Sequence, residues 1–159
     1  MSDITYASTA EGWLYVASIM DLFIRKIVGW KADSRMTKEL VIDALEQAYE
    51  REKPDAGLLH HSDRGSQYAS KEYQDKLQDY KMFGSMSRKG NCYDNTCIES
   101  FHSIIKRELI HLERYETRAR AKKDIWEYIE LWHNRLRIHS SIGYKTPAQY
   151  QSMYYQDFS

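Results

Sequence analysis

Three carboxylates of this 159-residue chain stand where the predicted elements could bring them together: Asp3, Asp63 and Glu99. The first lies in the first expected strand, the second follows the fourth strand, and the third lies on the helix after the fifth. In a mixed sheet the first and fourth strands can be neighbours, and a covering helix can add a third group. Converging carboxylates repel one another unless a cation lies among them. Sequence order alone permits such a cluster without indicating it.

Oxygen ligands of this kind suit hard divalent cations, and Mg²⁺ commonly takes few protein carboxylates together with substrate phosphates. Two such ions about 3.5–4 Å apart would stabilise both the attacking and the leaving oxygen at a phosphodiester. The chemistry open to these three residues is therefore a metal-dependent reaction at a phosphodiester.

Glu99 lies in a stretch, residues 85–109, that begins as a polar loop and continues as an amphipathic helix. At ~100° per residue, Glu99 and Lys106 project within about 20° of each other, beside the apolar stripe. An acid and a base would thus share an exposed flank, which is also what an ordinary amphipathic helix presents. The stripe spans roughly 80° and contains Ile98, Phe101, Ile105, Leu109 and Leu112.

The elements before that helix are predicted from periodicity and turn residues. Three strands with short connections, one of them at residues 21–22, indicate an antiparallel meander with Gly29 at a bulge. A helix follows Thr37 as its N-cap and runs to about residue 52. The predicted strands cover residues 3–8, 13–20, 25–32, 58–61 and 82–86, and a second helix covers residues 70–80.

Two helices are predicted after the one that carries Glu99. The first covers residues 117–137, and Thr146 with Pro147 opens a short final helix. The order β-β-β-α-β-α-β-α-α indicates an α/β fold, a mixed sheet with helices on both faces. One face of the long helix is predicted to bury Ile125, Ile129, Trp132 and Leu136.

The composition fits a single globular domain, because 42% of residues are hydrophobic and 29% are charged. No apolar run approaches the ~18 residues of a membrane span, and no signal peptide opens the chain, so we expect an intracellular protein. The formal net charge is zero, yet residues 101–123 hold seven bases against three acids. This local excess could attract a phosphate backbone or could be a solvated helix surface.

The two cysteines, Cys92 and Cys97, have neither CxxC spacing nor the number expected of a disulfide framework. A zinc site with His102 is conceivable, but reduced thiols in a cytosolic protein are the favoured interpretation.

Five segments occur in an order that is specific when they are taken together. Thirty-five residues separate Asp63 from Glu99, and Lys106 follows Glu99 by seven positions. The segments are DITY at residues 3–6, DLFIRKIVGW at 21–30, HHSDRGSQY at 60–68, SMSRKGNCYDNTCIESF at 85–101 and HNRLRIHSSIGYKTP at 133–147. Together they resemble the catalytic core of bacterial insertion-sequence transposases related to retroviral integrases, a branch of the DDE recombinases with a ribonuclease-H-like fold.

The resemblance implies a five-stranded mixed sheet, three antiparallel strands and then two parallel ones, flanked by helices. Residues 1–115 would form the catalytic core, and residues 116–159 a C-terminal helical extension of the same domain. Asp3, Asp63 and Glu99 would hold two Mg²⁺ ions, with Mn²⁺ as a substitute.

DNA contacts are implied as well. Lys106 would contact the DNA of the transposon end. A mobile loop beside the site would reach the DNA backbone through Arg88, Lys89 and Asn91.

The implied activity is metal-dependent phosphodiester cleavage and strand transfer at transposon ends by a DDE polynucleotidyl transferase. DNA is the implied partner, a homo-oligomer the implied assembly, and the bacterial cytoplasm with its nucleoid the implied location, away from membranes. Family members usually carry an upstream helix-turn-helix region that recognises the ends. Because the chain begins two residues before Asp3, we expect a core fragment or truncated reading frame without that region. An inactive remnant that only binds DNA or oligomerises, and a nuclease of the same fold, are the alternatives.

Other residues in these segments have structural interpretations. Asp94 and Asn95 are expected to cap the helix, Gly65 to permit the turn after the acid, and His61 to serve as a hydrogen-bonding residue. Asp21 is rejected as the first acid, because the family's first acid precedes the second strand.

The C-terminal segments leave two questions. Trp126 and Trp132 are expected in the core or at an interface. For Arg135, Arg137 and His139, DNA binding and hydrogen bonds to helix-end carbonyls both stay open.

Overall fold

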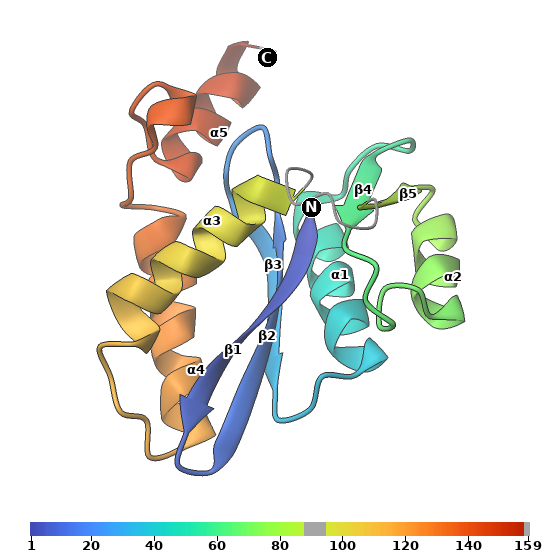
Figure 1. Cartoon of the computed structure of the whole chain (residues 1–159). Coiled ribbons are helices and arrows are strands. Elements are labelled where there is room, and N and C mark those ends of the chain that lie inside the picture. The colour runs from blue at the N-terminus through green and yellow to red at the C-terminus, as the bar shows by residue number, and fades with distance from the viewer. Residues whose placement is uncertain (88–94, 158–159) are drawn as a thin grey trace.

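A five-stranded mixed sheet forms the centre of the computed structural model, which describes residues 1–87 and 95–157 (Figure 1). The strands lie in the order β3-β2-β1-β4-β5. An antiparallel meander is followed by two strands parallel to β1, so the predicted α/β class and strand directions are confirmed. The strands are β1 (Ser2–Thr9), β2 (Gly12–Met20), β3 (Ile27–Asp33), β4 (Leu59–Ser62) and β5 (Phe83–Met86).

Helices cover both faces of this sheet (Figure 1). Each face has its own apolar core, and no helix in the described parts of the chain is long and apolar enough to cross a membrane. On one face lie α1 (Lys38–Glu52) and α2 (Lys71–Asp79), on the other α3 (Thr96–Ile105) and α4 (Arg118–Glu127), and α5 (Pro147–Asp157) follows at the C-terminal end.

Helix α1 packs directly on β3 because of one glycine. A Cβ atom added to Gly29 would meet the backbone oxygen of Ala44 and lie 2.7 Å from the Cβ atom of Ala48. Both alanines belong to the buried face of α1, so small residues on both elements let helix and strand approach closely. The register between β2 and β3 shifts beside Gly29, which confirms the predicted bulge.

The third strand begins two residues later than predicted. Oδ1 of Asp21 accepts hydrogen bonds from the N–H groups of Phe23 (2.8 Å) and Ile24 (3.3 Å). Arg25 has a left-handed φ of 60°. An Asx turn therefore occupies the connection, and the predicted two-residue connection is wrong.

A π-helical segment, Lys106–Ile110, follows α3 and breaks the predicted apolar period. The N–H of His111 donates to the carbonyl oxygen of Lys106, five residues earlier, at 2.8 Å. Because a π turn holds more residues than an α turn, later side chains rotate away from the α-helical stripe. Ile110 is buried while Leu112 is 73% exposed, so the predicted stripe is wrong at its C-terminal end.

A second π-helical segment, Tyr128–His133, has the same effect on the helix that begins with α4. Trp132 and Leu136, predicted on the buried face, are 44% and 63% exposed. His133 and Asn134 are buried instead. The predicted helix is present over residues 118–133, and Ile125 and Ile129 are buried as predicted. The prediction is wrong for Trp132 and Leu136, for the same physical reason.

Buried Asn134 ties the C-terminal segment to the sheet. Its Oδ1 accepts from the N–H of Ile27 and its Nδ2 donates to the oxygen of Ile27, both at 2.9 Å. Its own carbonyl oxygen accepts from the N–H of Ala148 at 3.0 Å. Nearby, Nη1 of Arg137 donates to both carboxylate oxygens of Glu108, at 2.7 and 2.6 Å. Arg137 thus forms an ion pair, which neither of its predicted roles included.

Candidate active site

The pairing of β1 with β4 places Asp3 and Asp63 side by side. Ser2 of β1 pairs in parallel with Ser62, the last residue of β4, and the two aspartates follow these serines directly. Neighbouring strands lie about 4.8 Å apart, so the carboxylates extend from adjacent backbone positions. Both aspartates are half-buried. The strand order therefore places Asp3 and Asp63 at neighbouring backbone positions, as sequence order permitted.

Asp63 is held by the turn that follows it. Its Oδ1 accepts a hydrogen bond from the N–H of Gly65 at 2.7 Å. A Cβ atom at Gly65 would lie 2.9 Å from that oxygen and 2.9 Å from Oε1 of Gln67, closer than a Cβ atom tolerates. Gly65 has no positive φ. The close approach of the carboxylate, rather than the predicted turn conformation, therefore explains this glycine.

Asp3 contacts a buried histidine that the sequence suggested only as a conceivable zinc ligand. Nδ1 of His102 lies 3.4 Å from Oδ2 of Asp3, and Nε2 of His102 lies 2.7 Å from the hydroxyl oxygen of Ser18. Ser18 is the residue of β2 that pairs with Asp3. Oδ1 of Asp3 accepts from the N–H of Ile4 at 2.8 Å. Asp3 thus has a hydrogen bond at Oδ1 and a contact with the imidazole at Oδ2.

Glu99 is exposed and lies on α3, one helical turn before His102. Residues three apart share a helix face, and this spacing was the available sequence signal for His102. Nζ of Lys106 lies 4.3 Å from the ring centroid of Tyr6. His102 contacts Asp3, and Lys106, further along the chain, contacts Tyr6, which lies further along β1. The helical segment and β1 therefore run side by side in the same direction.

The three carboxylates do not converge as a finished metal site. Within residues 1–87 and 95–157, no group of three His, Cys, Asp or Glu side chains is close enough to hold a metal ion. The structure places Asp3 and Asp63 at neighbouring backbone positions and Glu99 on the neighbouring helix. Asp3, Asp63 and Glu99 fit a hard divalent cation, because all three offer carboxylate oxygens. The carboxylates of Asp3 and Asp63 each accept a hydrogen bond from a backbone N–H group.

The loop before α3 contains further predicted residues. Asn95 precedes α3, but its side chain does not cap the helix, because Oδ1 accepts from the hydroxyl of Ser87 at 3.0 Å. The capping role predicted for Asn95 is therefore wrong. His61 bridges the hydroxyls of Ser85 and Ser87, both at 3.1 Å, which confirms its hydrogen-bonding role. Four predicted residues lie outside the described part of the chain: Arg88, Lys89, Asn91 and Asp94.

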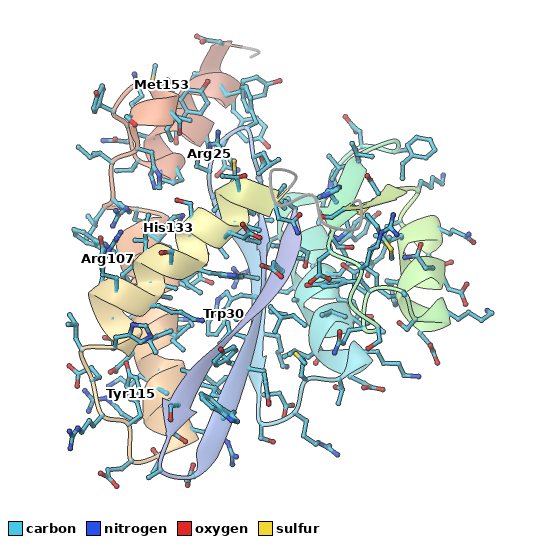
Figure 2. All side chains as sticks on the ribbon, viewed as in Figure 1. Arg25, Trp30, Arg107, Tyr115, His133 and Met153 are labelled. Carbon is cyan, nitrogen blue, oxygen red and sulfur yellow. The ribbon has the colours of Figure 1, made fainter. Side chains whose placement is uncertain are left out.

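Cys97 has a hydrogen-bond partner, Arg25. It is a free thiol whose sulfur accepts a hydrogen bond from Nη1 of Arg25 at 2.8 Å, near the start of α3 (Figure 2). Both ring nitrogens of His102 have the contacts given above. Cys92 lies outside the described residues.

Comparison with known proteins identifies relatives over nearly the whole chain. The family model described as the integrase core domain matches residues 1–92, and a second model with the same description matches residues 99–155. The transposase for insertion sequence element IS904 of Lactococcus lactis subsp. lactis is 48% identical over 151 residues, which cover 95% of this chain and 60% of that protein. Transposase InsF for insertion sequence IS3A of Escherichia coli is 45% identical over 150 residues, 94% of this chain and 52% of that protein. The chain thus spans between about half and 60% of the length of these relatives.

Solved structures share the fold. The HTLV-2 integrase catalytic core domain in complex with magnesium (trimeric form) has a TM-score of 0.68 at 19% identity, covering 93% of this chain and 91% of that one. A chain of the simian T-cell lymphotropic virus intasome has a TM-score of 0.74 at 18% identity, covering 93% and 51%. Identities this low show the fold alone, whereas the family match and the transposase relatives are matches of sequence. The chain therefore belongs to the integrase core domain family, as its motifs predicted.

Proposed function

We propose that this chain is the catalytic core of a metal-dependent transposase, a polynucleotidyl transferase that cleaves DNA at transposon ends and joins them to another strand. The observation that carries the proposal is the side-by-side placement of Asp3 and Asp63, with Glu99 on the helix that contacts Asp3 through His102. The names of the relatives, both transposases, support it.

Asp3, Asp63 and Glu99 would hold two Mg²⁺ ions, or Mn²⁺ in their place. Bound there, the ions would stabilise negative charge on the attacking and the leaving oxygen. The magnesium named with the solved integrase core supports this choice of metal. Asp3 and Asp63 would be the fixed ligands, because His102 and Gly65 hold their carboxylates, and Glu99 would add the third carboxylate from α3.

The reaction has two steps that need no covalent bond between protein and DNA. In the first, the oxygen of water bonds to phosphorus, the bond from phosphorus to the 3′ oxygen breaks, and that oxygen takes a proton to become a 3′-hydroxyl. In the second, this hydroxyl oxygen loses its proton and bonds to a phosphorus of another strand, whose own 3′ oxygen leaves and takes up a proton. Lys106 would contact the DNA backbone during both steps, and Arg88, Lys89 and Asn91 are the further contacts that we propose.

We also infer that several copies assemble on DNA, since two transposon ends have to be joined to one target. The solved relatives of the same fold are titled as an intasome and as trimeric and dimeric core domains. Those titles support a homo-oligomer for this chain.

The experiment that tests the proposal is a nicking and strand-transfer assay on a labelled end substrate with Mg²⁺ or Mn²⁺. Glu99→Gln should abolish both activities and leave the unfolding temperature unchanged, since Glu99 is exposed. The matched control is Glu127→Gln on α4, another exposed glutamate, which should keep both. Full activity in Glu99→Gln would refute the mechanism, and hydrolysis without joining in the unaltered chain would indicate a nuclease of the same fold.

A further inference from the structure

A groove of about 940 Å³ runs along β1 beside the proposed site. Its walls are the β1–β2 hairpin, the π-helical segment Lys106–Ile110 and the loop that follows this segment. Tyr6, which lines it, is three residues beyond Asp3, about 10 Å along a strand that rises ~3.3 Å per residue. Because Asp3 and Tyr6 are three positions apart, their side chains leave opposite faces of the sheet. The groove therefore reaches the carboxylates around the edge of β1, where Lys106 from the helix beside Asp3 contacts Tyr6.

Two half-exposed aromatic side chains line this groove. Tyr6 and Trp13 are each 49% exposed, and their rings meet edge to face with centroids 5.0 Å apart. Lys106 places its ammonium 4.3 Å from the ring centroid of Tyr6. Tyr6 stays open because β4 pairs with β1 only at Ser2, so no other described strand lies beside the rest of this edge of β1. Aromatic surface beside a cation is what proteins use to bind unpaired nucleotides.

Length limits what the groove can hold. Lys106 lies at the end nearest the carboxylates, whereas Glu113, Arg114 and Glu116 lie at the other end. There Thr9 forms an isolated β-bridge with Tyr115. Tyr115 lies at the end of β1 away from the N-terminus (Figure 2). The open edge is therefore short, because it ends at this bridge. A long strand of DNA or an added β-strand would not fit, but one or two nucleotides next to the carboxylates would.

We propose that Tyr6 and Trp13 hold an unpaired deoxynucleotide next to the scissile phosphodiester. The base would stack on their exposed aromatic surface, and Lys106 would pair with the phosphate of the same nucleotide. This inference rests on the proposed function, because it takes the carboxylates as the place of reaction. It predicts a preference for ends with an unpaired nucleotide over blunt ends.

The test compares two labelled duplexes that differ only in a short unpaired 3′ extension, bound to the full chain without metal. Stacking by one base corresponds to roughly a five- to 150-fold change in affinity, so Tyr6→Leu and Trp13→Leu should weaken binding of the extended duplex by a factor in this range. Binding of the blunt duplex should change less than about two-fold. Tyr6→Phe keeps the ring and should bind as the unaltered chain does. Trp126→Leu, a change of another exposed tryptophan, is the matched control.

Each outcome decides the matter. The nucleotide site would be overturned if Tyr6→Leu and Trp13→Leu weakened binding of both duplexes equally, or left binding of the extended duplex unchanged. Tighter binding of an extended peptide than of DNA would overturn it as well. If Glu99→Gln abolishes nicking while Tyr6→Leu and Trp13→Leu bind the extended duplex normally, the proposed function stands and the nucleotide site fails. If the unaltered chain does not nick but these two variants lose the preference for the extension, the nucleotide site stands without the reaction.

Discussion

The contact between His102 and Asp3 gives the sharpest prediction about stability and metal binding together. His102→Leu removes the hydrogen bond to Ser18 and the contact with Asp3. The hydroxyl of Ser18 is fully buried, and a buried polar group without a partner costs about 1–3 kcal/mol. In a chain of this size each kcal/mol lowers the unfolding temperature by about 2–4 °C. The expected decrease is therefore roughly 2–12 °C.

The same change should also weaken metal binding, because one oxygen of Asp3 loses its anchor. Loss of a hydrogen-bond partner behind a metal ligand typically weakens metal affinity about 10- to 100-fold. The double variant Ser18→Ala/His102→Leu separates the two effects, since removing both partners spares the cost of an unpaired group. It should recover most of the lost stability and none of the lost affinity.

Thermal unfolding followed by circular dichroism and Mn²⁺ titration calorimetry measure these two quantities. His111→Leu, a change of an exposed histidine, is the control and should alter neither. If the double variant binds Mn²⁺ as tightly as the unaltered chain, His102 serves the fold alone and the reasoning about Asp3 is refuted. Unchanged stability in His102→Leu would refute the reasoning about Ser18.

Three more predictions follow from single contacts. Gly29→Ala forces a Cβ atom against the backbone of α1 and should lower the free energy of unfolding by about 1–3 kcal/mol in urea titrations; an unchanged value would contradict the close packing. Gly65→Ala should displace the carboxylate of Asp63 and weaken Mn²⁺ binding in calorimetry, and intact affinity would contradict its close-approach role. Burial lowers the pKa of His60 to about 3, while an unfolded histidine titrates near its usual ~6.5. Between these pH values the unfolded chain binds one more proton than the folded chain, so the free energy of unfolding should fall as pH drops from about 6.5 toward 3. His60→Phe should make the dependence of this free energy on pH less steep by about 1.4 kcal/mol per pH unit. An unchanged dependence would contradict the effect of burial.

Sequence prediction succeeded where the signal is local. The buried face of α1 follows the helical period from Leu40 to Ala48. Thr146 caps α5 as predicted, since its hydroxyl accepts from the N–H of Gln149, and Oε1 of Gln149 accepts from the N–H of Thr146 in return. The positions of Asp63 and Glu99 relative to their elements follow from the same kind of pattern.

Prediction failed where the fold overrides the local period. A π turn adds residues to a helical turn, and the polar and apolar pattern of the sequence does not reveal it. Leu112 and Leu136 were therefore predicted on buried faces, whereas both side chains are exposed. His102 offered only its spacing from Glu99, because its two partners come from strands more than eighty residues earlier. The amide of Asn134 pairs with β3 across a similar separation, which no local pattern reveals.

The central claim is that Asp3, Asp63 and Glu99 form one metal site. Titration calorimetry of the intact chain with Mn²⁺ tests it most directly, with Asp63→Asn and Glu99→Gln as the site variants and Asp75→Asn on α2 as the control. We predict a heat of binding that is retained in the control and lost in both site variants. No binding by the intact chain, or undiminished binding by Asp63→Asn, would contradict the account and favour a remnant without catalytic activity.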